Sequence, residues 1–125
     1  MPGKSKIQPT WHKNVEADNF EAAESYLQLI YSIKRSAKLV AALRGARPAR
    51  FRAKDIFRAS QLSHLGISNL RVARDRKKIM EGIPLSPILL VRDATNGRVI
   101  VADGYHRLCA VYEFNESAWI PCRIV

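Results

Sequence analysis

Five consecutive residues, Asp103, Gly104, Tyr105, His106 and Arg107, carry the chemistry that this sequence shows most clearly. They follow an apolar segment and open a stretch with helical spacing. The first N–H groups of a helix have no partner inside the helix, and the helix dipole adds partial positive charge there. Gly104 would let an anion approach the backbone, and His106 and Arg107 would add donors suited to phosphate oxygens. The run therefore predicts a phosphate-binding helix start.

Each of these residues also has a structural interpretation. Asp103 is a good helix N-cap, and it is equally suited to orient Arg107 or a Mg²⁺ ion. His106 and Tyr105, taken singly, are typical of partly buried packing residues. If the chain catalyses a reaction, Asp103 and His106 are the candidate catalytic residues. Gly104, Tyr105, His106 and Arg107 are the candidate ligand contacts, with Tyr105 stacking on the ligand or lining its pocket.

The chain has two cysteines, Cys109 and Cys122, which fit reduced and mostly buried thiols. A zinc site made of His106, Cys109 and Cys122 is weakly indicated, because such sites usually have a fourth, regularly spaced ligand. No Ser-His-Asp arrangement can be assembled from the spacing. We therefore predict no metal site built from these side chains.

Positive charge is concentrated in two parts of the sequence. The net charge is +10, and the segment from Lys34 to Arg58 contains nine Lys and Arg residues but a single acidic residue, Asp55. A second basic segment spans Arg71–Lys78. Solvated surface is the plain interpretation, and phosphate contacts to DNA or RNA are the functional one. The candidate nucleic-acid contacts are Arg47, Arg50, Arg52, Lys54, Arg71, Arg74, Lys77 and Lys78.

The N-terminal part of the chain predicts a tail followed by helix. Residues 1–15 show neither a helical nor a strand period and predict a flexible basic tail. Residues 16–45 predict a helical lead-in, with Asp18 as N-cap, Glu21 completing a capping box and a possible break near residues 32–36. Its expected apolar stripe consists of Phe20, Ala23, Tyr26, Leu27, Ile30, Ile33, Ala37, Val40 and Leu43.

The rest of the chain predicts short helices and strands in alternation. Helical spacing covers residues 53–62, 70–81 and 105–114, whereas residues 87–91, 99–102 and 119–125 are typical of strands. Asn96-Gly97 predicts a hairpin between the first two strands. Pro121 favours an edge position, or the beginning, of the last strand. The sequence thus predicts a single α+β domain over residues 16–125, with a small mixed sheet behind an N-terminal helix or helix pair.

Residues 53–125 resemble the ParB/sulfiredoxin-like superfamily. The resemblance rests on Asp103-Gly104-Tyr105-His106-Arg107-Leu108, which is similar to the Asp-Gly-x-His-Arg signature, and on the Pro-containing segment 85–91. It implies a ParB-like core in which Gly104, His106 and Arg107 hold the phosphates of a nucleotide. ATP or CTP with Mg²⁺ would be the cofactor. Members include nucleotide-binding domains of partition proteins, sulfiredoxins and kinases that phosphorylate free serine.

The resemblance leaves several activities open. Sulfiredoxins place their reactive cysteine where this chain has Tyr105, so sulfinic-acid repair is disfavoured. A serine-kinase-like phosphotransferase needs a second carboxylate beside Asp103, and Glu81, Asp93 and Glu113 are the candidates, none marked by a motif. The residues are also compatible with a nucleotide hydrolase, with a ParB-like nuclease, and with a non-specific DNA- or RNA-binding module that uses the basic clusters.

The sequence shows neither a signal peptide nor an apolar stretch long enough to span a bilayer. We therefore expect a cytoplasmic protein without a membrane partner.

Overall fold

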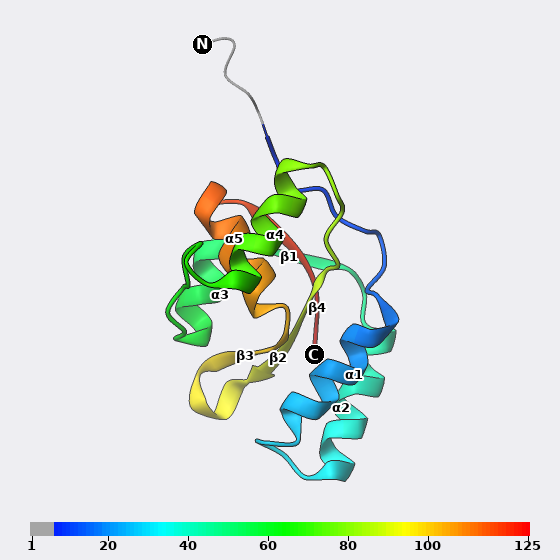
Figure 1. Cartoon of the computed structure of the whole chain (residues 1–125). Helices are drawn as coiled ribbons and strands as arrows, with labels where there is room; N and C mark the ends of the chain where they lie inside the picture. Colours follow the sequence, from blue (N-terminus) through cyan, green and yellow to red (C-terminus); the bar gives the residue numbers. More distant parts are fainter. Residues whose placement is uncertain (1–6) are drawn as a thin grey trace.

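The computed structural model describes residues 7–125, which form five α-helices, a short 3-10 helix and four β-strands. In chain order these are α1 (Ala17–Leu27), α2 (Ile33–Gly45), β1 (Ala49–Arg52), α3 (Ala53–Ser60), α4 (Leu70–Met80), β2 (Ile88–Asp93), η1 (Ala94–Asn96), β3 (Arg98–Asp103), α5 (Tyr105–Phe114) and β4 (Trp119–Ile124). The described chain is α+β, as predicted, and of the two expected alternatives, one helix or a helix pair, it has the pair at its N-terminal end (Figure 1).

The four strands form one mixed sheet in the order β1-β4-β2-β3. β1 pairs antiparallel with β4, β2 pairs antiparallel with β3, and β2 and β4 run parallel. The predicted β2–β3 hairpin is confirmed, with Gly97 at φ 65° closing its turn. Asp93 holds this turn, because its carboxylate accepts hydrogen bonds from Asn96 and from Arg98.

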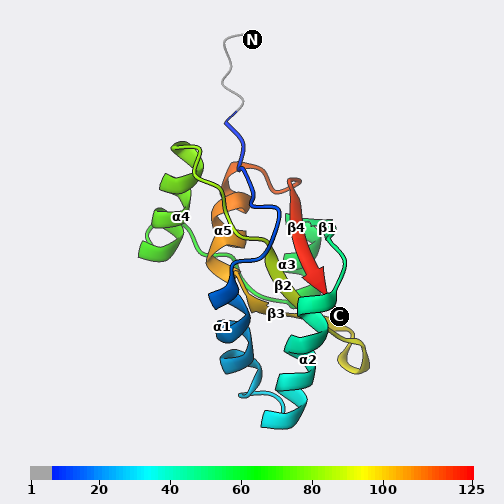
Figure 2. The ribbon, with the colours of Figure 1, turned by 90° about the vertical axis from the view of Figure 1, so that its right-hand side faces the viewer.

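Buried apolar side chains form a cluster on each face of the sheet. Successive side chains of a strand point to opposite faces, so Ile88 and Leu90 pack with α3, α4 and α5, whereas Leu89 and Val91 pack with α1 and α2. The side view shows α1 and α2 beside each other at the lower end of the molecule, with α4 and α5 in its upper part (Figure 2). The sheet is therefore shared by both clusters.

The N-terminal helical segment is interrupted, but at residues 28–32 and not at the expected 32–36, most of which belongs to α2. α1 ends at Leu27, and Ser32 caps α2 by accepting a hydrogen bond from the Arg35 N–H at 3.0 Å. The prediction of Asp18 as N-cap is wrong, because Glu16 takes that position without a side-chain cap and Asp18 lies in the first turn. There the carboxylate of Asp18 still has a favourable interaction with the helix dipole.

The predicted apolar stripe is buried only in part. Its buried members are Phe20, Ala23, Leu27, Val40 and Leu43, and its exposed members are Tyr26, Ile30, Ile33 and Ala37. The period of a single continuous helix cannot hold across the break, because the turn between α1 and α2 sets a new rotation for the second helix. Ile30 in the turn and Ile33 at the start of α2 consequently face solvent, whereas Leu27 at the end of α1 is buried.

Two features of the sheet differ from the prediction. Residues 49–52, expected to be part of a basic loop, form the edge strand β1, whose Phe51 side chain packs on the core while Arg50 and Arg52 point to the opposite face. Pro121 lies inside β4, which is a central strand and not an edge. The pairing of β4 with β2 begins only at Cys122, so a ladder bond to β2 is not lost at the proline.

Residues 1–6 of the expected tail lie outside the described part of the chain. Within the rest of it, Thr10 and His12 form backbone hydrogen bonds with Leu85, each 2.8 Å long. Trp11, between them, packs against the larger core cluster. Residues 7–15, here called the arm, are therefore attached to the rest of the domain around Trp11. Within residues 7–125, none of the helices combines the length and the apolar character needed to cross a membrane.

Candidate phosphate-binding site

The junction between β3 and α5 has the backbone geometry that an anion site needs. Gly104 connects the two elements with φ +105°, and its carbonyl accepts the first helical hydrogen bond, from Leu108 N–H at 2.9 Å. The N–H groups of Tyr105, His106 and Arg107 consequently have no partner within the helix. A Cβ on Gly104 would lie 2.8 Å from Arg107 Nη2 and 2.9 Å from Ile88 Cγ1. Both φ and space therefore require glycine.

Arg107 is held beside this junction by three acceptors. Its Nη2 atom lies 3.0 Å from Asp103 Oδ2, 3.0 Å from Asn19 Oδ1 and 3.5 Å from the Pro87 carbonyl. Its Nε atom is buried without a hydrogen-bond partner among the described residues. An unpartnered buried guanidinium nitrogen costs stability.

Asp103 does not cap α5. The N-cap is Gly104, without a side-chain cap, and Asp103 instead forms the ion pair with Arg107 one helical turn away. Both side chains are 17% exposed. Burial raises the pKa of Asp103 above its ordinary value, against the lowering effect of the Arg107 charge. The partly buried ion pair thus positions the guanidinium next to the helix start.

α4 brings a basic face to the same place. A cavity of about 210 Å³, here called the α5 pocket, is lined by residues 103–107 together with Arg71, Arg74, Asp75 and Lys78 of α4. These four residues share one side of α4, because Arg74 and Asp75 lie three and four residues after Arg71, and Lys78 lies three residues after Asp75. Four side chains that carry permanent positive charge, counting Arg107, meet two carboxylates in this pocket. Its electrostatic potential therefore favours an anion.

Asp75 is a site residue that the sequence patterns did not reveal. It is buried at 9% exposure on α4, and burial raises its pKa against the lowering effect of Lys78 and Arg107. The carboxylates considered from sequence lie elsewhere: Asp93 holds the hairpin turn, and Glu81 and Glu113 do not line the pocket. One signal was present, since Asp75 is the single acidic residue in a strongly basic helix.

Tyr105 and His106 occupy the outer part of the site. The Tyr105 hydroxyl donates a hydrogen bond to the Ser63 carbonyl, and its ring lies edge-on to the His106 ring with centroids 5.3 Å apart. Burial and the charge of Arg71 lower the pKa of His106 below its ordinary value, although Asp75 acts against them. Near pH 7 His106 is therefore a neutral hydrogen-bonding group with one donor nitrogen and one acceptor nitrogen.

A second cavity, of about 390 Å³, adjoins the α5 pocket. The two share Arg71 and residues 103–106, and the adjoining cavity adds Ala22 and Tyr26 of α1, and Leu62. The two cavities therefore lie side by side: the α5 pocket is lined by charged side chains, and the adjoining cavity also has aromatic and aliphatic side chains. Such a pair of compartments suits a ligand with an anionic end and a ring.

The predicted nucleic-acid contacts separate into three groups. Arg71, Arg74 and Lys78 line the α5 pocket. Arg50 and Arg52 line a different cavity, beside β1 and β4. Arg47, Lys54 and Lys77 line neither of these two cavities. The structure therefore does not join the eight residues into one site.

Both thiols are buried, and neither lies in a group of potential metal ligands within residues 7–125. Cys109 and Cys122 are free and buried, and Cys109 Sγ accepts a hydrogen bond from Leu65 N–H at 3.3 Å. Burial raises the pKa of Cys109 and brings that of Cys122 to about 11. No group of three or more His, Cys, Asp or Glu side chains within residues 7–125 could hold a metal ion.

Comparisons with models of protein families, with curated protein sequences and with solved structures found no match to this chain.

Proposed function

We propose that the protein binds a nucleotide, or another ligand with a terminal phosphate, with the phosphates in the α5 pocket. The observation that carries the proposal is the convergence of Arg71, Arg74 and Lys78 from α4 with Arg107 at the N-terminus of α5. Free N–H groups and the helix dipole favour an anion there.

The adjoining cavity supports a nucleotide over a bare anion. The α5 pocket has room for phosphates but is smaller than the cavities that usually enclose a whole organic ligand. The adjoining cavity is nearly twice as large, and Tyr26 and Leu62 give it surface on which a base can pack. In this arrangement the phosphates lie against α5 and α4, and the base extends toward α1.

The fold and the sequence run together favour a ParB/sulfiredoxin-like protein. The run from Asp103 to Leu108 lies at the strand-to-helix turn where the resemblance requires it, and the sheet is small and mixed. Sulfinic-acid repair is not part of the proposal, because Tyr105 occupies the place of the reactive cysteine. The proposed ligand is ATP or CTP.

Magnesium fits this pocket only as a companion of the phosphates. Mg²⁺ commonly takes one or two carboxylates together with phosphate oxygens and water. Asp103 and Asp75 are the carboxylates that line the α5 pocket, and Asp103 already pairs with Arg107. The residues present could contact a nucleotide-bound ion, in which case the ion would neutralise phosphate charge.

Calorimetric titration of ATP, CTP and GTP with Mg²⁺ tests the proposal. Charged hydrogen bonds are worth about 1.5–3 kcal/mol, so Arg107→Ala should weaken binding by roughly tenfold or more. Lys78→Ala should also weaken it, whereas Lys77→Ala, which removes the neighbouring charge outside the pocket, should change it little. Absence of binding heat with all three nucleotides at millimolar concentration contradicts the proposal.

A second candidate function is phosphotransfer to a small hydroxyl compound. It is favoured by Asp75, a carboxylate that lines the α5 pocket together with Asp103. Among residues 7–125, Asp75 has no ion-pair partner within 4.0 Å. A raised pKa suits a group that accepts a proton from a substrate hydroxyl. In this candidate Asp75 is the general base, and Arg107 and the helix start hold the transferred phosphate.

Product analysis separates the two candidates. A phosphotransferase releases ADP from ATP when a hydroxyl substrate is added, whereas a simple binder does not. Asp75→Asn keeps the size of the side chain and removes its negative charge, so it should preserve or tighten nucleotide binding and abolish turnover. Unchanged turnover in Asp75→Asn would rule out Asp75 as the base.

A further inference from the structure

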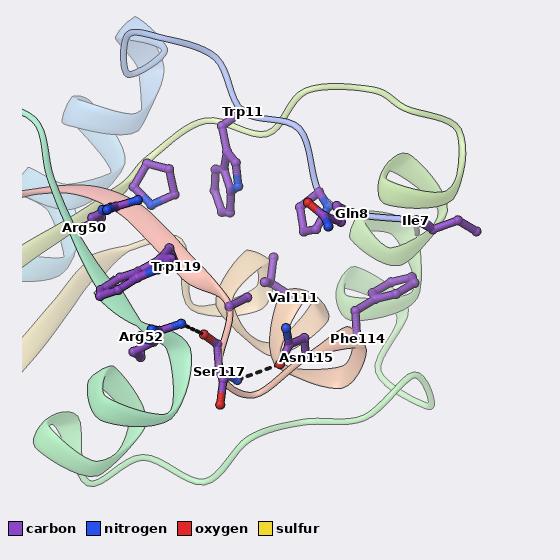
Figure 3. Close-up of a pocket in the computed structure, with 13 residues that line it drawn as sticks. Ile7, Gln8, Trp11, Arg50, Arg52, Val111, Phe114, Asn115, Ser117 and Trp119 are labelled. Carbon is purple, nitrogen blue, oxygen red and sulfur yellow. Dashed lines mark hydrogen bonds between the residues drawn. The ribbon is translucent and has the colours of Figure 1, made fainter. Parts of the chain in front are cut away.

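A further cavity lies away from the α5 pocket and is lined by both tryptophans of the chain. We call this cavity of about 720 Å³ the tryptophan groove. It is bounded by arm residues 7–9 and 11, the end of α5, and the β1–β4 side of the sheet (Figure 3). Trp11 points from the arm into the groove, and Trp119 lies beside Arg50 and Arg52 (Figure 3).

The sheet register explains why these groups face outward. In β1, Arg50 and Arg52 are two residues apart and share a face, and their partners in β4 are Pro121 and Trp119. The intervening residues, Phe51 and Ile120, pack on the larger core. On the face of the sheet that carries Arg50 and Arg52, the buried side chains of α1 and α2 pack against β2 and β3. The β1–β4 half is left with an exposed aromatic and cationic surface, and Trp119 is 42% exposed.

The two arginines are positioned but not neutralised. The guanidinium of Arg52 stacks 3.8 Å from the centre of the Trp119 ring, and that of Arg50 lies 4.6 Å from it. Arg52 Nη1 also donates a hydrogen bond to the Ser117 carbonyl at 2.7 Å. Neither arginine has a carboxylate within 4.0 Å among residues 7–125. Stacking fixes the planes of both groups and leaves N–H donors at their edges.

We infer that the tryptophan groove binds a single-stranded segment of nucleic acid. Trp11 offers stacking surface for a base, and the guanidinium planes that lie over Trp119 offer a second surface on which a base can stack. Arg50 and Arg52 also supply cations for the phosphates. Unstacked bases expose the faces that tryptophan requires, whereas a duplex hides them. An acidic peptide would satisfy the arginines but would leave the aromatic surface without a matching partner. This binding is independent of the proposed α5 ligand.

Intrinsic fluorescence gives a direct measurement, because the only two tryptophans of the chain line the groove. Titration with a short oligothymidylate should quench the emission. Trp119→Ala should raise the Kd by about 5- to 150-fold, because it removes the ring that holds Arg50 and Arg52 and with it one of the stacking surfaces. Trp119→Phe should retain most of the affinity, with Trp11 as the remaining reporter. Circular dichroism of each variant identifies any that fails to fold.

The salt dependence tests the arginines separately. Each phosphate contact to a single strand contributes about 0.7 to the slope of log K against log salt, so Arg50→Ala with Arg52→Ala should lower that slope by about 1.4. Arg35→Ala is the matched control, because Arg35 also lies over an aromatic ring, Tyr31, but on α2 and outside the groove. It should leave the slope and the quenching nearly unchanged.

Three results would overturn the inference. The first is an oligothymidylate titration that leaves tryptophan emission unchanged. The second is binding that Trp119→Ala and the arginine double variant do not weaken. The third is equal quenching by a duplex or by a polyglutamate peptide, which would assign the groove to another class of partner. Arg107→Ala should bind the oligonucleotide like the unaltered chain, so loss of the α5 ligand remains distinguishable from loss of the strand.

Discussion

Arg107 Nη2 donates a hydrogen bond to Asn19 Oδ1, 88 residues earlier in the chain, at a distance of 3.0 Å. This contact joins α1, which packs against β2 and β3, to the first turn of α5. It gives the N-terminal helix pair a direct connection with the candidate site. The guanidinium that would meet a phosphate is therefore positioned from outside the segment that resembles the ParB/sulfiredoxin-like superfamily.

Substitution of Asn19 should affect both stability and ligand binding. Asn19→Ala removes an acceptor for a charged donor and should lower the free energy of unfolding by about 1.5–3 kcal/mol, measured by urea denaturation. Nucleotide binding should weaken as well, because Arg107 loses one of its positioning contacts. Asn19→Asp keeps an acceptor and adds negative charge, so it should preserve stability while still weakening the binding of an anion. Wild-type affinity in both variants would contradict this role.

Gly104→Ala should destabilise the protein more than a positive φ alone explains. Gly97 also has a positive φ, of 65°, but nothing lies within 4 Å of a Cβ placed there. Gly97→Ala therefore measures the conformational cost, which is about 1–3 kcal/mol. At Gly104 the added Cβ would in addition press on Ile88 and displace Arg107. Thermal unfolding of the two variants measures the difference, and equal losses would show that the close approach is unimportant.

The titration of His106 should be displaced toward low pH. Its pKa in the folded protein is lowered, first by burial and then by Arg71. The unfolded chain, with the ordinary value near 6.5, therefore binds a proton more readily than the folded chain. Stability should be complete above about pH 6.5 and fall as pH decreases through the folded pKa. NMR titration of the His106 ring should show the shift, and Arg71→Ala should reduce it.

Urea denaturation at about pH 7.5 and about pH 5.5 measures the consequence for stability. His106→Gln should lose less stability between these two pH values than the unaltered chain does, because Gln does not take up a proton. The same loss in both proteins would show that His106 does not contribute to the pH dependence. Phosphate bound in the α5 pocket should raise the His106 pKa, since the added negative charge favours the imidazolium form.

Both thiols should be unreactive in the folded protein. Burial brings the pKa of Cys122 to about 11 and raises that of Cys109, so little thiolate forms at about pH 8. A chromogenic disulfide reagent should react slowly with the native protein and should modify two thiols per chain after unfolding in guanidinium. Rapid modification of the native protein would contradict the burial of these side chains and reopen thiol chemistry at Cys109.

Sequence alone determined most of the local structure beyond residue 53 and one half of the site. The segments of helical and strand period, the Asn96-Gly97 hairpin and the start of α5 after Gly104 follow from short-range patterns that the structure confirms. Helix breaks and starts depend on backbone and capping chemistry within a few residues, so a break could be anticipated, although it lies at residues 28–32 and not at 32–36. The prediction failed for Asp18 because Glu16 begins α1 without a side-chain cap.

Only the tertiary structure decided which surfaces meet. The short, basic sequence of β1 has no strand pattern of its own, and the segment is a strand because it pairs with β4. Pro121 is tolerated inside β4 because the pairing of β4 with β2 starts after it. Asp75 lines the α5 pocket because α4 packs beside α5. Trp11 lines the same cavity as Trp119 because backbone hydrogen bonds attach the arm to Leu85. These contacts join residues far apart in sequence, and local periodicity carries no information about such distances. The helix start at Gly104 could be predicted from neighbouring residues. The charged lining of the α5 pocket and the aromatic lining of the tryptophan groove depend on the packing of distant segments.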